Sequence, residues 1–199
     1  TTVKFNLGSL VQYIDLGQIG LPDIQRPFVW SNTKVRDLFD SMYRGYPVGY
    51  LLFWQNAFVS DANYIGVDYK QKTPNLLIVD GQQRLTSLYA VIKGVAVIRE
   101  NYTAETIKIA FDPLSERFEV SDAAIRKDAS FIPNISDLWS DRIDIFDFVD
   151  TYLHQLSSTR EITDDEEKRI KKSISRLSNL GNYPFTVLEL AANLGEEEV

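Results

Sequence analysis

The feature that most constrains this chain is the segment Leu76–Leu88, with the sequence LLIVDGQQRLTSL. Leu76–Val79 places four apolar residues in a row, which is the pattern of a buried central strand. Asp80 and Gly81 interrupt this run, because glycine accepts backbone angles that other residues avoid and so favours a tight turn. Apolar residues recur at helical spacing from Leu85 onward. The sequence therefore predicts a buried strand that turns directly into a helix.

A turn of this kind suits an anion. The first N–H groups of a helix have no intrahelical partner, and the helix dipole adds partial positive charge. Arg84 falls in the predicted first turn, where its guanidinium can bind two oxygens of one phosphate. The amides of Gln82 and Gln83 and the hydroxyls of Thr86 and Ser87 can bond to phosphate oxygens or to a water molecule. The segment is thus predicted to suit a bound phosphate group.

A simpler interpretation of the segment is a turn followed by an amphipathic helix. In that case Asp80 would cap the helix and the two glutamines would be solvated. Spacing alone does not separate the two interpretations. The position of Arg84 favours the phosphate site, because a cation at a helix N-terminus opposes the dipole unless an anion lies beside it.

The segment Leu21–Trp30, with the sequence LPDIQRPFVW, is the second candidate for a site. Proline disfavours helix at the residue before it, so the segment is predicted to be extended around Gln25 and Arg26. Arg26 is either stacked on the ring of Phe28 or Trp30, or it is a second cation that faces the same ligand as the first site. The residues leave both possibilities open.

A third segment, Tyr46–Tyr50, leads into an apolar run. Its Gly49 either marks a bend or lets a ligand approach the backbone closely. A bend is the preferred interpretation.

The remaining pattern predicts an α+β fold. It divides the chain into a domain at residues 1–130 and a helical segment at residues 131–199. Strands are expected at Val3–Phe5, Val48–Trp54, Val95–Arg99, Thr106–Asp112, Arg117–Val120 and Tyr183–Leu190. Helices are expected from a Ser9 cap to Gly17, at Asn32–Arg44 after a Ser31 cap, from Leu85 to Gly94, at Asp144–Leu156, and from a capping box of Thr163 and Glu166 to Leu180.

Several site classes are excluded by the composition. The chain has no cysteine and one histidine, so disulfides, thiolate sites, His/Cys zinc sites and an HNH nuclease centre cannot form within it. His154 itself is predicted to be an exposed helix residue. The sequences GxxxxGK[ST] and GxGxxG are absent, which excludes a P-loop and a Rossmann fingerprint.

Charge and hydropathy limit the partners. The net charge of −7 argues against a module that grips DNA mainly by neutralising phosphates, although a local basic groove remains possible. No apolar stretch is long enough to span a bilayer, and Thr1–Lys4 lacks the basic region of a signal peptide. We expect a soluble cytoplasmic protein without a membrane partner. The absent initiator Met and the abrupt end at Val199 indicate a piece of a longer protein.

The order IQRPFVW, RGYPVG, an apolar strand and VDGQQRLTSL resembles the N-terminal domain of GmrSD-type modification-dependent restriction enzymes and related phage-defence proteins. The likeness is close over about residues 5–120 and looser in the helical part. It implies a ParB/sulfiredoxin-like fold, a mixed sheet with flanking helices followed by a helical segment. It also implies that this half hydrolyses nucleoside triphosphates, while a separate C-terminal HNH domain cuts DNA.

Site roles follow from the same resemblance. Arg84 and Arg26 would hold the phosphates and offset the charge that develops on the transferred phosphoryl group. Asp80 would position Mg²⁺ or polarise water, and Gln82 or Gln83 would orient the attacking water. The implied catalytic residues are Asp80, Gln83 and Arg84, and the implied nucleotide-binding residues are Gln25, Arg26, Gly81, Gln82, Gln83, Arg84 and Thr86.

The leading hypothesis is an NTP-hydrolysing regulatory domain of a defence nuclease. The main alternative is a nucleotide switch without turnover, or a module that reads modified DNA. A third possibility is a purely structural partner-binding domain. Family members usually carry an FxRxNxxG-like segment just beyond the position of Val199, and it is absent here. The nuclease half is absent too, so we expect no DNA cleavage from these residues, and expect DNA and an HNH domain or subunit as partners only in the full-length system.

Overall fold

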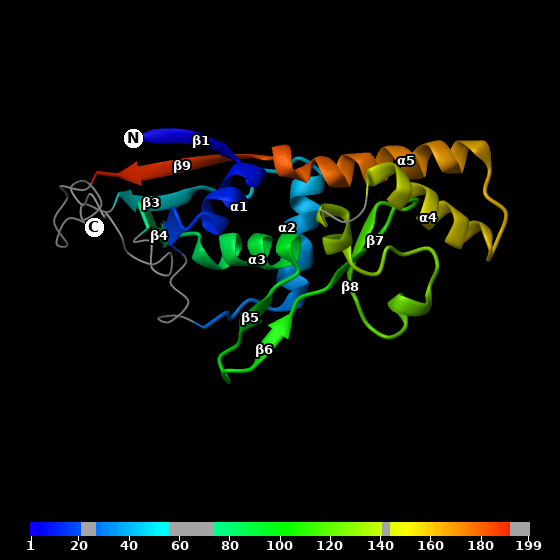
Figure 1. Ribbon diagram of the computed structural model, residues 1–199, viewed down its shortest axis with the longest axis horizontal. Helices are drawn as coiled ribbons and strands as arrows, with labels where there is room; N and C mark the ends of the chain where they lie inside the picture. Colours follow the sequence, from blue (N-terminus) through cyan, green and yellow to red (C-terminus); the bar gives the residue numbers. More distant parts are fainter. Residues whose placement is uncertain (21–26, 56–73, 141–143, 192–199) are drawn as a thin grey trace, which may run out of the picture. The chain divides into compact units, whose positions relative to one another are not determined.

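The computed structural model of the protein describes residues 1–20, 27–55, 74–140 and 144–191. Helices and strands are mixed along these residues, which confirms the predicted α+β class (Figure 1). Gln25 and Arg26 lie outside the described residues.

The chain forms two compact units that alternate along the sequence. The first unit comprises Thr1–Pro27, Gly49–Leu85 and Gly181–Val199, and the second comprises Phe28–Val48 and Thr86–Leu180. No boundary between the units falls at residue 130. The division into residues 1–130 and 131–199 stays a prediction, as does the ParB/sulfiredoxin-like label for the fold.

A mixed five-stranded sheet is the centre of the first unit. Its strands, in spatial order, are β1 (Thr2–Asn6), β9 (Pro184–Leu190), β3 (Leu51–Gln55), β4 (Leu76–Asp80) and β2 (Ile19–Gly20). β1 is antiparallel to β9, β9 is parallel to β3, β3 is antiparallel to β4, and β4 is parallel to β2. A strand from the end of the chain therefore separates β1 from β3.

Two details of the first unit correct the sequence predictions. Helix α1 (Leu7–Asp15) is capped by Asn6, whose side chain accepts a hydrogen bond from the Ser9 N–H at 2.7 Å. Ser9 was therefore wrongly expected to be the cap. The prediction of a fully buried β4 is also wrong, because Ile78 is its only buried residue.

Helix α3 (Gln82–Lys93) starts in the first unit and continues into the second. Leu85, Leu88 and Val91 are completely buried and recur at the spacing of one helical face. The predicted strand-to-helix segment is thereby confirmed as a piece of secondary structure.

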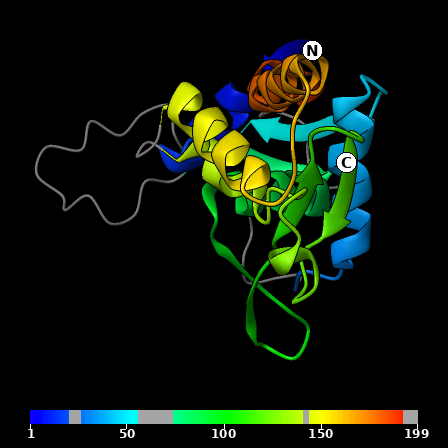
Figure 2. The ribbon, with the colours of Figure 1, turned by 90° about the vertical axis from the view of Figure 1, so that its right-hand side faces the viewer.

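The second unit combines helices with two antiparallel hairpins. Its helices are α2 (Asn32–Tyr43), α4 (Ile145–Ser157) and α5 (Asp164–Ser178). Its strands are β5 (Ala96–Ile98), β6 (Ala104–Thr106), β7 (Ile109–Asp112) and β8 (Arg117–Val120). Short 3₁₀ turns are η2 (Ile125–Lys127) and η3 (Ile135–Trp139), and a third, η4 (Asn179–Asn182), follows α5. β5 pairs with β6 and β7 pairs with β8, so the single strand expected at Thr106–Asp112 is two strands. Helix α4 packs alongside α5 (Figure 2).

Two helix starts and one apolar stripe in this unit match the sequence. Ser31 caps α2 by accepting a hydrogen bond from the Lys34 N–H. Thr163 and Glu166 form the predicted capping box of α5. The thin apolar stripe on α5 is completely buried, because Ile170, Ile174 and Leu177 are all 0% exposed. These features follow from local sequence alone.

Tyr43 joins three elements of the second unit. Its buried hydroxyl donates to Glu116 Oε1 at 2.9 Å, beside the β7–β8 hairpin, and lies 2.9 Å from Ser173 Oγ on α5. Arg176 stacks on the Tyr43 ring at 4.5 Å. Burial, chiefly, raises the pKa of Tyr43 to about 12.

We expect this buried tyrosine to make stability fall at high pH. Above about pH 10 the unfolded chain ionises Tyr43 while the folded chain keeps it protonated. The stabilisation is therefore complete below pH 10 and is lost as the pH rises through about 12. In urea unfolding, the advantage of the wild type over Tyr43→Phe should shrink by up to about 1.4 kcal/mol per pH unit in that window. A difference that stays constant from pH 9 to pH 12 would contradict the shift.

Candidate functional site

The Asp80–Arg84 turn has the geometry predicted for it. Strand β4 ends at Asp80, Gly81 has φ +87°, and α3 begins at Gln82. The Leu85 N–H donates to the Gly81 carbonyl at 2.9 Å, which closes the first helical turn. The start of α3, with its partial positive charge, therefore lies directly at the end of β4.

Gly81 is required here for two reasons. Its positive φ is a conformation that residues with a side chain rarely adopt. A Cβ at this position would also collide with Cδ2 of Leu51, a completely buried residue of β3. The backbone of the turn therefore packs directly against the neighbouring strand.

Arg84 lies against the backbone that leads into β3. Its Nη1 donates a hydrogen bond to the Tyr50 carbonyl at 2.8 Å. A Cβ placed on Gly49 would lie 3.2 Å from Arg84 Nη2 and 3.4 Å from Cζ. Among the described residues, no carboxylate pairs with Arg84. A guanidinium with one neutral partner still has N–H groups that can donate hydrogen bonds to an oxyanion.

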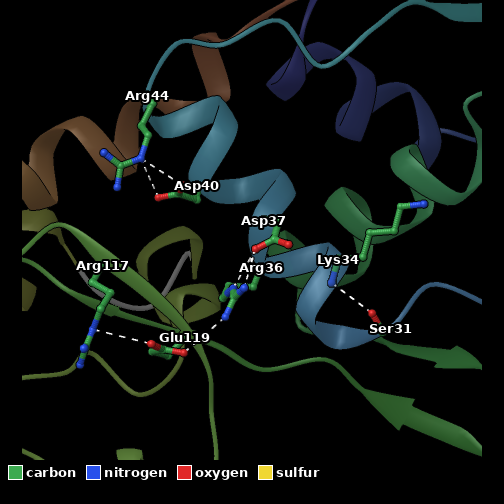
Figure 3. A network of polar contacts seen from close by, with 8 residues as sticks. All are labelled: Ser31, Lys34, Arg36, Asp37, Asp40, Arg44, Arg117 and Glu119. Carbon is green, nitrogen blue, oxygen red and sulfur yellow. Dashed lines mark hydrogen bonds and ion pairs between the residues drawn. The ribbon is translucent and has the colours of Figure 1, made fainter.

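Other arginines of the chain are in a different situation. On and beside α2, Arg36 contacts Asp37 at 2.6 Å and Glu119 at 3.5 Å, and Arg44 contacts Asp40 at 3.0 Å (Figure 3). Exposed pairs of this kind contribute little to stability, but they compensate the charge of each arginine. Arg84 differs from them because its contact is with a carbonyl rather than a carboxylate.

The described part of the second predicted segment contacts the turn through Gln83. Gln83 Nε2 donates to the Pro27 carbonyl at 3.3 Å. Pro27 directly follows Gln25 and Arg26, so the chain next to these two residues lies at the Asp80–Arg84 turn. The side chains of Gln25 and Arg26 themselves lie outside the described residues.

The aromatic rings of this segment have other cations as partners. Arg99 lies over the Phe28 ring at 4.9 Å, and Lys34 lies over the Trp30 ring at 4.2 Å. Each ring that was considered as a stacking partner for Arg26 therefore already carries a cation on one face. Both interpretations of Arg26 stay predictions, because Arg26 lies outside the described residues.

Arg99 is the residue that sequence reasoning missed in this region. Its guanidinium donates to the Trp30 carbonyl, to Asn32 Oδ1 at 2.6 Å and to Glu105 at 2.7 Å. Hydrogen bonds from Arg99, and then from Asn32, lower the pKa of Glu105. The contacts of Arg99 with Trp30 and Asn32 span 69 and 67 positions along the chain, so the sequence around Arg99 does not indicate them. The cluster anchors the segment after Pro27 to the β5–β6 hairpin.

The remaining predicted residues differ in how exposed they are to a ligand. Asp80 is exposed at the end of β4, and Gln82 is half-buried in the first turn of α3. Thr86 is half-buried and is the first residue of the second unit. Ser87 is completely buried, so the prediction that its hydroxyl serves an external phosphate is wrong. His154 is exposed on α4, as expected.

Metal ligands are sparse in the part of the chain that the structure describes. It contains no group of three or more His, Cys, Asp or Glu residues that could hold a metal ion. Asp80 is a single exposed carboxylate. Mg²⁺ in nucleotide sites commonly uses one or two carboxylates together with the substrate phosphates. A lone Asp80 therefore fits Mg²⁺ delivered with a nucleotide better than a metal bound by protein ligands alone.

A hollow in the second unit is separate from these residues. It has a volume of about 470 Å³ and lies between α4 and α5, where Ile145, Phe146, Val149 and Lys171 are among its lining residues. None of the predicted site residues lines it.

None of the helices within the described ranges is both long enough and apolar enough to cross a membrane.

Comparison with known proteins identifies one family. The family model described as GmrSD restriction endonuclease, N-terminal domain, matches residues 7–198. Uncharacterized protein MJ0686 of Methanocaldococcus jannaschii is 31% identical to this chain over 96 residues. That alignment covers 44% of this chain and 17% of the relative, so the chain corresponds to a small part of that longer protein.

Proposed function

Because the chain belongs to the family of GmrSD restriction endonuclease N-terminal domains, we propose that it is the NTP-binding and NTP-hydrolysing regulatory domain of a modification-dependent restriction or phage-defence nuclease. The family match covers nearly the whole chain and confirms the resemblance inferred from the sequence. A restriction or defence role follows from membership in this family. The nucleotide and its hydrolysis are our proposal.

One observation carries the assignment of the site. The guanidinium of Arg84 lies at the start of α3, holds one carbonyl at 2.8 Å, and has no carboxylate partner among the described residues. A helix N-terminus and a guanidinium with available donors are both attracted to phosphate oxygens. Together they support binding of a phosphate chain at Asp80–Arg84.

Each residue has a role in the proposed reaction. Arg84 binds the phosphates and offsets the charge that develops on the transferred phosphoryl group, with Arg26 as a second cation. Gly81 keeps the backbone free of a side chain, and Gln82 or Gln83 orients the attacking water. Asp80 would hold the Mg²⁺ that accompanies the nucleotide, which neutralises phosphate charge when bound. Gln25 and Thr86 complete the proposed binding set.

The alternative is a domain that binds a nucleotide without turnover, as a switch, or that reads modified DNA. The observation on the side of the switch is that Asp80 is the only carboxylate of the Asp80–Arg84 segment, so the segment itself offers no pair of carboxylates for general base catalysis. The wider partners are also proposals. They are DNA and a C-terminal HNH nuclease domain or subunit, in a cytoplasmic restriction system.

The proposal is tested by titrating the protein with nucleoside triphosphates and Mg²⁺ and then measuring phosphate release. We expect binding in the micromolar range or tighter, which corresponds to about −8 kcal/mol or better, followed by slow release of phosphate. Binding without release would favour the switch. A protein that binds no triphosphate would refute the phosphate site in either form.

A further inference from the structure

Gly49 was expected to mark a bend, but its surroundings point to a function. It has φ +90°, and the guanidinium of Arg84 fills the space where a side chain would begin. A Cβ there would lie 3.2 Å from Nη2 and 3.4 Å from both Cζ and Nη1. Contacts this short are tighter than most Cβ contacts, so a methyl group there would push the guanidinium away by a few tenths of an ångström. The neighbour that needs the bare backbone at Gly49 is therefore Arg84.

The next residue completes the seat for the guanidinium. The Tyr50 carbonyl accepts a hydrogen bond from Arg84 Nη1 at 2.8 Å. One nitrogen is fixed by this bond, while the flat contact with Gly49 limits rotation of the group about it. An arginine side chain has many rotamers, and fixing one of them in advance lowers the entropy cost of binding. The Gly49–Tyr50 backbone thus determines where the remaining donors of Arg84 point.

We propose that Gly49 is a positioning residue for the phosphate site, acting through Arg84 by giving its guanidinium a place against bare backbone. This inference rests on the proposed function, since it assumes that Arg84 binds phosphate. Gly49 itself need not touch the ligand. Its contribution is that Arg84 meets the phosphate chain in one orientation, next to the start of α3.

Gly49→Ala tests this with inorganic tripolyphosphate as the ligand, which carries the phosphate chain without a base. Calorimetric titration should show binding about ten- to hundredfold weaker than in the wild type, which is the range for a lost hydrogen bond to a charged group. In the Arg84→Ala background, the same substitution should change the affinity no further. That non-additivity is the sign that Gly49 acts through Arg84.

Gly45→Ala is the matched control. Gly45 has a similar backbone angle, φ +78°, but an added Cβ would meet nothing within 4 Å. It should therefore lose stability for the same conformational reason as Gly49→Ala and keep wild-type affinity for tripolyphosphate. Gly49→Asn guards against a failure to fold, because Asn tolerates positive φ better than Ala while its Cβ meets the same guanidinium.

The outcomes are distinguishable. If wild-type protein binds no tripolyphosphate or NTP, the proposed function and this inference both fail. If Arg84→Ala abolishes binding while Gly49→Ala and Gly49→Asn bind as the wild type does, only the inference fails. It also fails if Gly49→Ala weakens binding equally in the wild-type and Arg84→Ala backgrounds.

Discussion

Replacing Arg84 with alanine is expected to weaken triphosphate binding by at least ten- to hundredfold. The guanidinium is the one cationic side chain within Asp80–Arg84, and each charge-assisted hydrogen bond that it makes to a phosphate contributes about 1.5–3 kcal/mol. Stability should change little, because within the described residues the side chain holds only the Tyr50 carbonyl. Calorimetric titration with an NTP measures the first effect, and urea unfolding measures the second.

Arg117→Ala is the control for this substitution. Arg117 is 59% exposed and its nearest carboxylate, Glu119, is 3.7 Å away, so its removal takes the same charge from the protein at another place. It should leave triphosphate affinity unchanged, apart from a small long-range electrostatic effect that salt screens. Equal losses in Arg84→Ala and Arg117→Ala would show that net charge, rather than the turn, governs binding.

Gly81→Ala is expected to lower the free energy of unfolding by about 2–5 kcal/mol. A non-glycine residue at a left-handed backbone angle costs about 1–2 kcal/mol, and forcing a methyl group against a packed core costs about 1–3 kcal/mol more. The second contribution arises because the new Cβ would collide with buried Leu51. Urea unfolding followed by circular dichroism measures the change.

The comparison with Gly45→Ala isolates the collision. Gly45 has a positive φ but open space around an added Cβ, so its substitution should cost only the conformational part, about 1–2 kcal/mol. If Gly81→Ala cost no more than Gly45→Ala, the turn would have room for a side chain. The close packing of Gly81 on β3 would then be refuted.

Local features of the chain were predictable because their causes are local. The apolar run before Asp80, the break at Gly81 and the helical spacing from Leu85 together describe β4 and α3 in order. The capping box at Thr163 and Glu166 was likewise predictable, because it depends on four neighbouring residues. Each of these elements depends on contacts within one or two turns of chain.

The arrangement of the sheet was not predictable in the same way. The sequence indicated a strand near Pro184–Leu190, but nothing in it placed that strand between β1 and β3. Strand pairing depends on residues far apart in sequence, and no pattern within a strand identifies the strand with which it pairs. The incomplete burial of β4 was not predictable either, because it depends on what covers the strand rather than on the strand itself.

The candidate site contains both a residue that the sequence indicated and contacts that it did not. Arg84 was recognised because a cation at a helix start is unexpected on dipole grounds. Its contact with Gly49 joins residues 35 positions apart, so the sequence could offer only a choice between a bend and a close approach. In the structure Gly49 has a positive φ and its backbone lies close to the Arg84 guanidinium. Arg99 was missed for the same reason, since its partners Trp30 and Asn32 are 69 and 67 positions away along the chain.

The central claim is that Asp80–Arg84 holds the phosphates of a nucleotide. A crystal structure of the protein with Mg²⁺ and a non-hydrolysable NTP analogue tests it most directly. We predict phosphate oxygens within hydrogen-bonding distance, about 2.7–3.2 Å, of the Arg84 guanidinium and of N–H groups at the start of α3. An analogue bound with its phosphates elsewhere, and with Arg84 still in contact only with Tyr50, would contradict the claim.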